Sequence, residues 1–196
     1  MFEELLRWRR DVRHFRVDAV DPADLDWLFA MAALAPSVGN AQPWRFVRVR
    51  DAARREALAT HVDACNAAAA LDQRAAYRAL KLHGIREAPE LIAVFSDEAP
   101  AAGHRLGIAT MPEMLRYSTV MAVHTLWLAA QTRGIGVGWV SILEPAVVTA
   151  LLDVPGDWAL IALLCVGYPV AASDVPELER RGWQAREPMQ LRIFER

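Results

Sequence analysis

The amino-acid sequence predicts an α+β fold in which helices and a sheet form a sandwich, built by a single domain over residues 1–196. Helical and strand patterns mix along the chain without the strict strand–helix alternation that builds a doubly wound fold. The Gly-x-Gly-x-x-Gly run of dinucleotide-binding folds follows none of the predicted strands. A length of 196 residues fits one domain and is sufficient to bury a sizeable core.

Helices are predicted where apolar residues recur at helical spacing or where capping residues stand. Asp21 and Pro22 open one helix as an N-cap and a first-turn proline. Asp51 caps an alanine-rich helical region, interrupted at Ala67–Ala70 by either close packing or a mobile lid. A helix capped by Ser118 or Thr119 is apolar almost all round and is expected to lie between subunits. The expected ranges are 2–10, 22–36, 51 to about 82, 118–133 and 145–152.

Strands are predicted where apolar and polar residues alternate or where short apolar runs occur. Phe46–Val49 alternates, and Leu191–Phe194 alternates like an edge strand near the C-terminus. Continuous apolar runs predict buried strands over 91–95, 137–142 and 160–166. Ser96–Thr110 is rich in Ala, Gly and Pro and is expected to be a long loop, of the kind that covers a site or is disordered.

Composition excludes several classes of protein. A net charge of −2 and a pI near 6.2 argue against a general nucleic-acid binder. The cysteines Cys65 and Cys165 are far apart and the histidines are scattered, so no metal site is expected. The N-terminus does not have the pattern of a signal peptide, and no apolar run approaches the roughly 20 residues that span a bilayer. We therefore expect a cytoplasmic protein with no membrane partner.

The stretch from Pro36 to Trp44 joins a helix to a strand and is rich in polar side chains. Pro36 stops the helix, Gly39 permits unusual dihedral angles, and Pro43 is expected to force Gln42 into an extended conformation. Three side chains of this loop both donate and accept hydrogen bonds, namely Ser37, Asn40 and Gln42. The loop is either an ordinary capped turn or a segment that reads the heteroatom edge of a flat polar ring.

A basic run, Arg9-Arg10-Asp11-Val12-Arg13, stands near the N-terminus. The planar guanidinium group binds two phosphate oxygens at once, so three of them close together suit a phosphate clamp. A short basic run by itself is more often a solvated surface. Because Lys81 is the only lysine, the arginine content also reflects a compositional bias.

Together, the basic run and the Pro-Ser-x-x-Asn-x-Gln-Pro-Trp loop resemble the flavin-dependent nitroreductase family. The resemblance extends over nearly the whole chain and is most specific to one branch, the BluB-type 5,6-dimethylbenzimidazole synthases. The order and spacing of further segments carry it, namely Lys81–Pro89, Leu115–Thr119, Gly136–Ile142, Pro176–Glu179 and Gly182-Trp183.

This resemblance implies a three-layer α-β-α sandwich with a mixed, mainly antiparallel sheet. It also implies an intertwined homodimer in which a C-terminal arm, about 187–196, reaches the partner and two FMN sites lie at the interface. The phosphate would be held by Arg9, Arg10, Arg13 and Arg186. The flavin would be approached from the partner chain by Ser37, Asn40 and Gln42. Further binding residues implied by position are Val12, Pro36, Lys81, Leu82, Val140 and Ser141.

The implied reaction uses reduced FMN and dioxygen as substrates. Its products are 5,6-dimethylbenzimidazole, which is the lower ligand of vitamin B12, and erythrose 4-phosphate, and a flavin reductase would supply the reduced FMN. The alternatives on the same fold are an NAD(P)H-dependent nitroreductase or flavin reductase, a reductive dehalogenase, and a flavin-binding dimer without turnover.

Asp11 and Ser141 are the expected catalytic residues. The arginines around Asp11 favour its ionised form, and a carboxylate near the ribityl chain could accept protons as the sugar is cleaved. Alternatively, Asp11 only neutralises and orients those arginines. Ser141 follows a buried strand, where its hydroxyl either hydrogen-bonds the flavin or is an ordinary satisfied group.

Overall fold

The computed structural model describes residues 1–70, Tyr77 and residues 80–196. Its centre is a sheet of four strands, β1 (Trp44–Arg48), β2 (Glu90–Asp97), β3 (Gly136–Val140) and β4 (Trp158–Gly167). The strands lie in the order β1-β2-β4-β3, and each neighbouring pair is antiparallel. The four strands predicted in the first 167 residues are thus confirmed, with shifted bounds. β1 begins two residues early, β2 and β4 are longer than their apolar runs, and β3 ends at Val140, two residues before its predicted end.

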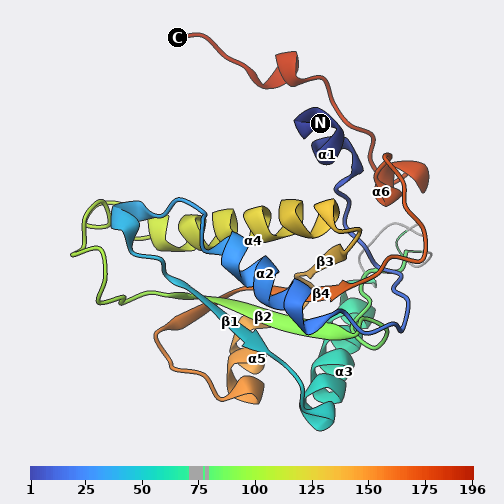
Figure 1. Ribbon diagram of the computed structural model, residues 1–196, viewed down its shortest axis with the longest axis horizontal. Helices are drawn as coiled ribbons and strands as arrows, with labels where there is room; N and C mark the ends of the chain where they lie inside the picture. Colours follow the sequence, from blue (N-terminus) through green and yellow to red (C-terminus); the bar gives the residue numbers. More distant parts are fainter. Residues whose placement is uncertain (71–76, 78–79) are drawn as a thin grey trace.

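Helices cover both faces of this sheet and complete three layers (Figure 1). One face is covered by α2 (Pro22–Ala32) and α4 (Met114–Thr132), the other by α3 (Ala52–Ala69) and α5 (Pro145–Leu152). Side chains along β2 alternate between the two cores: Ile92 and Val94 on the α2–α4 side, Leu91 and Phe95 on the other. Burying one such side chain stabilises the fold by about 1.5–3 kcal/mol. The predicted α+β sandwich is confirmed.

Two of the predicted helix starts are confirmed by their capping bonds. The side chain of Asp21 accepts from the Ala23 N–H, and that of Asp51 accepts from the Arg54 N–H, each at 2.8 Å. The predicted start at Ser118 or Thr119 is wrong, because α4 begins four residues earlier at Met114. Both hydroxyls lie inside the helix and donate to backbone carbonyls four residues back.

The predicted helix from Asp51 to about Leu82 is too long. α3 runs without interruption through Ala67 and ends at Ala69, and residues 80–84 are not helical. His83 contacts the Asp63 carboxylate at 2.9 Å, whereas a continuous helix would separate these residues by about 30 Å. The chain therefore turns back toward α3, and the remainder of the predicted segment lies outside the described residues.

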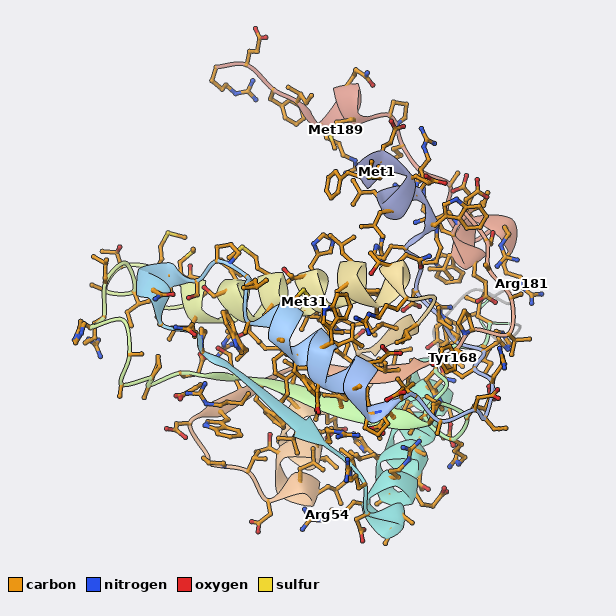
Figure 2. All side chains as sticks on the ribbon, in the orientation of Figure 1. Met1, Met31, Arg54, Tyr168, Arg181 and Met189 are labelled. Atoms are coloured by element: carbon orange, nitrogen blue, oxygen red, sulfur yellow. The ribbon has the colours of Figure 1, made fainter. Side chains whose placement is uncertain are left out.

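Both ends of the chain extend beyond the three layers. α1 (Phe2–Trp8), α6 (Glu177–Arg180) and the 3-10 helix η3 (Met189–Arg192) lie outside the sandwich in Figure 1. Figure 2 shows Met1 and Met189 in these projecting segments, and both side chains are exposed. The predicted edge strand Leu191–Phe194 is wrong, since the segment is partly 3-10 helix and pairs with none of the sheet strands described. An alternating pattern does not form a strand unless a neighbouring strand supplies hydrogen bonds.

The loop predicted over Ser96–Thr110 begins two residues later than expected, because Ser96 and Asp97 belong to β2. Asp97 is held there by Arg45 of β1, at 2.5 Å between Nη2 and Oδ2. None of the helices in the described part of the chain is both long and apolar enough to cross a membrane.

Candidate functional site

The predicted phosphate clamp and the predicted ring-reading loop lie at opposite ends of α4 (Figure 1). Near the beginning of α4, Ser118 Oγ accepts a hydrogen bond from the Val38 N–H at 3.0 Å. Nine residues further on, the indole N–H of Trp127 donates to the Arg10 carbonyl at 3.2 Å. At 1.5 Å per residue these contacts are about 14 Å apart along the helix. Within one protomer, α4 keeps the two predicted halves of the site apart.

The structure brings together the arginines that the sequence assigned to one clamp. A cavity of about 190 Å³ lies between the N-terminal segment and the segment around α6. Four arginines and one carboxylate from the prediction line it, namely Arg9, Arg10, Arg13, Arg186 and Asp11. Residues 176–178 complete the wall. A basic cavity of this kind, formed by segments far apart in sequence, is suited to an anion.

Arg9 is the clamp arginine with a buried donor that has no partner among the described residues. Its guanidinium stacks over the ring of Trp127, 4.8 Å from the centroid, and its Nε is buried with no hydrogen-bond partner among the described residues. Burial lowers the pKa of Arg9, and the nearby positive charge of Arg186 lowers it further. A buried donor without an acceptor destabilises a fold by about 1–3 kcal/mol, so a phosphate oxygen would relieve this site.

Arg10 and Arg13 already donate to protein oxygens. Arg10 donates from Nε to the Asp174 carbonyl at 2.9 Å and from Nη1 to the Arg9 carbonyl at 2.6 Å. Arg13 donates from Nε to the Asp11 carboxylate at 2.8 Å and from Nη1 to the Lys81 carbonyl at 3.1 Å. These two arginines therefore join chain segments as well as adding positive charge to the clamp.

Asp11 ties the N-terminal segment to the edge of the sheet. Its Oδ1 accepts from the Trp139 N–H at 2.9 Å while its Oδ2 accepts from Arg13. Asp11 also forms a parallel bridge with Val137, next to a hydrogen bond from the Val12 N–H to the Val137 carbonyl at 3.1 Å. The carboxylate is fixed by two donors and its side chain is about one-third exposed, at 32%.

The close approach of this segment requires a residue without a side chain in β3. A Cβ atom on Gly138 would overlap the backbone oxygen of Val12. Backbones meet this closely in strands where glycine removes the obstacle. Gly138 thereby sets the distance between Asp11 and the strand that leads to Val140.

The residues predicted to line a flavin ring are only partly gathered in one protomer. Leu82 and Val140 border a cavity that is too narrow to hold a water molecule, together with Asp11 and Val12. Lys81 forms an ion pair with Glu87. Ser141 is exposed, one residue beyond β3, and lines neither this cavity nor the arginine cavity. Ser141 therefore follows Val140 at the end of β3 with its side chain exposed.

The loop from Pro36 to Trp44 presents its amide side chains to solvent. Asn40 and Gln42 are exposed and adopt φ angles of 53° and 48°, in the left-handed region that L-residues rarely occupy. The expected extended conformation of Gln42 is wrong. Its N–H donates to Ser37 Oγ and its carbonyl accepts from Arg45, both at 3.1 Å, and these bonds hold the turn. Strained, exposed polar residues of this kind often occur at binding sites.

Trp127 is the contributor to the clamp that sequence reasoning missed. In the sequence it counts only as one apolar residue of a buried helix. In the structure it carries Arg9 on its ring and binds the Arg10 carbonyl through its N–H. The available signal was chemical, because the indole N–H of a partly buried tryptophan needs an acceptor. The identity of that acceptor depends on tertiary structure.

The chain is similar to known proteins along most of its length. The model of the nitroreductase family matches residues 6–168. The chain is 58% identical over 190 residues to a 5,6-dimethylbenzimidazole synthase of Rhodospirillum rubrum, covering 95% of this chain and 90% of that protein. It is 51% identical over 189 residues to a 5,6-dimethylbenzimidazole synthase of Rhodobacter capsulatus, covering 94% and 91%.

Solved structures show the same fold. An iodotyrosine deiodinase bound to FMN and 3-iodo-L-tyrosine superposes with a TM-score of 0.75 at 26% identity, covering 88% of this chain and 92% of that one. A nitroreductase family protein of Streptococcus pneumoniae gives a TM-score of 0.71 at 22% identity and covers 100% of both chains. With a family model that spans most of its length, the chain belongs to the nitroreductase family.

Proposed function

We propose that this protein is a 5,6-dimethylbenzimidazole synthase that fragments reduced FMN in the presence of dioxygen. The observation that carries the proposal is the 58% identity, over 95% of the chain, to a protein of that name. The order of the basic run and the Pro36–Trp44 loop supports the same reading. The second product would be erythrose 4-phosphate.

The residues present fit FMN. Arg9 has a buried Nε without a partner in the described chain, and Arg186 and Arg10 add positive charge beside it. We assign the phosphate to Arg9 and Arg186, with Arg10 and Arg13 completing the basic cluster. When bound, reduced FMN supplies both the electrons that dioxygen accepts and the carbon skeleton of the product.

The remaining roles follow from position along β3 and its neighbours. Val12, Leu82 and Val140 would pack against the ring, with Lys81 at its edge. The Asp11 carboxylate, held by Trp139 and Arg13, would accept protons from the ribityl chain as the sugar is cleaved. Ser141 would orient the flavin through its hydroxyl. Closing the site against water would protect reactive species, and the loop from Ser96 to Thr110 is a candidate cover. The other expected cover, near residues 67–80, lies largely outside the described residues.

A homodimer is part of this proposal. Within one protomer the loop and the clamp are about 14 Å apart along α4, and we place the clamp of one protomer and the loop of the other around each flavin. The outer side of α4 leaves Tyr117 and Val120 exposed by 51% and 39%. β1 forms an edge of the sheet, and Ile193 and Phe194 of the arm are exposed by 64% and 71%. A second copy that covers α4 and takes up residues 187–196 would bury these surfaces.

The decisive experiment is product analysis of the purified protein with excess reduced FMN in air. Mass spectrometry should detect dimethylbenzimidazole and erythrose 4-phosphate in equal amounts. Consumption of NAD(P)H with nitroaromatic or flavin acceptors, without fragmentation, would replace the proposal by a reductase. Flavin binding without either activity would leave a binding protein. The proposal further includes a cytoplasmic location and a flavin reductase as the supplier of reduced FMN.

A further inference from the structure

The loop from Ser37 to Gln42 is hydrogen-bonded to a buried hydroxyl of α4. Ser118 is 0% exposed, and its Oγ donates to the Met114 carbonyl at 2.7 Å. A serine inside a helix commonly makes this bond four residues back. Here the same oxygen also accepts the Val38 N–H at 3.0 Å, so it links the helix to the loop. Ser118 belongs neither to the arginine clamp nor to the exposed side chains of the loop.

A second contact also packs against the loop. The segment around Gly103 approaches so closely that a Cβ atom there would lie 2.8 Å from Cβ of Ala41. Ser118 and Gly103 thus contact the loop at Val38 and Ala41. The exposed side chains of Asn40 and Gln42 are left facing outward.

Thr119 provides an internal comparison. It is the next residue of the same helix, is also 0% exposed, and its Oγ1 donates to the Leu115 carbonyl at 3.2 Å. No bond joins it to the loop among the hydrogen bonds of the described residues. Two adjacent buried hydroxyls therefore both donate to carbonyls within α4. Of these two, the Ser118 hydroxyl also accepts a hydrogen bond from the loop.

We propose that Ser118 is a positioning residue for the flavin site of the other subunit. It fixes the backbone of the loop so that Asn40 and Gln42 keep their left-handed conformations and reach the partner's flavin. Without the hydroxyl, the Val38 N–H loses its acceptor and the strained turn relaxes. The inference rests on the proposed function, because it requires an FMN site shared between two copies.

The first test compares Ser118→Ala with Thr119→Val, measured by quenching of flavin fluorescence and by thermal unfolding. Both variants remove one buried hydroxyl and should lower thermal stability, Ser118→Ala by more because the Val38 N–H also loses its acceptor. Ser118→Ala alone should weaken FMN binding, by about fivefold or more, the loss expected for one hydrogen bond. It should raise the KM for reduced FMN and leave kcat close to that of the parent. Equal weakening by Thr119→Val would overturn the assignment.

A mixing experiment tests whether the loop acts on the partner's site. The Ser118→Ala protein has an intact clamp and a displaced loop. The Arg9→Ala protein has a defective clamp and an intact loop. Each is defective at both sites of its own homodimer. After random subunit exchange, mixed dimers contain one site with both parts intact, so about one quarter of all sites should regain parental FMN affinity. No recovery, with each variant still dimeric, would show that the loop serves its own subunit and would overturn the proposal.

A third variant guards against misfolding of Ser118→Ala. Gly103→Ala would strain its own backbone at a φ of 83° and would press on Ala41 of the same loop, so it should also weaken FMN binding. Parental FMN affinity in Gly103→Ala would count against a positioning role for the loop. Apart from the KM and kcat comparison, these readouts need FMN binding but no turnover. If the parent binds FMN but makes no dimethylbenzimidazole, the proposed reaction fails and the role of Ser118 still stands.

Discussion

The two ends of α4 carry two different kinds of recognition surface. At the Trp127 end, arginines gather around a cavity and one guanidinium nitrogen is buried without a partner in the described chain. At the Ser118 end, the loop from Pro36 to Trp44 contains no charged side chain. Its exposed groups are neutral amides on a strained backbone. The clamp is suited to bind a phosphate by charge, and the loop to read a ring by hydrogen bonds. In the proposed dimer, the two ends of one α4 would therefore serve two different flavins, the clamp at the phosphate of one and the loop at the ring of the other.

The largest expected effect tests the clamp. Arg9→Ala should weaken FMN binding by about 1.5–3 kcal/mol, the range for a hydrogen bond to a charged group, and should barely affect riboflavin, which lacks the phosphate. Arg13→Ala is the matched comparison. Because Arg13 holds Asp11 and the Lys81 carbonyl, its loss should affect both ligands and lower thermal stability as well. Titration of each variant with both flavins measures the difference, and equal losses for Arg9→Ala would refute a phosphate role.

The second effect concerns chemistry at the clamp end. Asp11→Asn and Ser141→Ala should retain FMN binding but lower dimethylbenzimidazole formation at least about tenfold, which equals roughly 1.4 kcal/mol of barrier. Asp18→Asn is the control, because Asp18 pairs with Arg16 Nε at the same 2.8 Å as Asp11 with Arg13, but at an exposed position. Product formation at the parental rate in both variants would remove these residues from the catalytic assignment.

The third effect tests the loop. Gln42→Gly should relieve the left-handed strain and raise the free energy of unfolding by about 1 kcal/mol, since glycine adopts this conformation without a Cβ clash. It should also weaken flavin binding through loss of the amide. Asp153→Gly relieves a similar φ angle of 53° at the end of α5, where it should stabilise the protein without changing flavin affinity. A Gln42→Gly protein with parental affinity would mean that this amide does not read the ring.

The smallest effect is a pH dependence near the clamp. A hydrogen bond from Lys81 lowers the pKa of Glu87 in the folded protein. The stability that this pair adds is therefore fully present above the ordinary carboxyl pKa. It is lost as the pH falls through the lowered pKa. Glu87 is 43% exposed, and solvent screening limits the contribution to less than about 1 kcal/mol. The difference in unfolding free energy between the parent and Glu87→Gln should therefore shrink between about pH 6 and about pH 3. A constant difference across this range would show that the pair is not ionic.

The sequence by itself determined the elements whose signals are local. Asp21 and Asp51 were identified as helix caps because a cap forms within one turn of the chain. The buried strands were found because a strand covered on both faces is continuously apolar. The basic run and the polar loop were found because their residue types are those that bind phosphate and ring heteroatoms.

Tertiary structure decided everything that depends on a distant partner. It made Leu191–Phe194 something other than a strand, placed Gln42 in a left-handed turn, and put Ser118 inside a helix, where its oxygen supports the loop. It also placed Arg9 on Trp127 and Arg186 beside it, across more than a hundred residues of sequence. Local propensity cannot specify such contacts, because hydrogen-bond acceptors, ring faces and charges from remote segments meet only after the chain has folded.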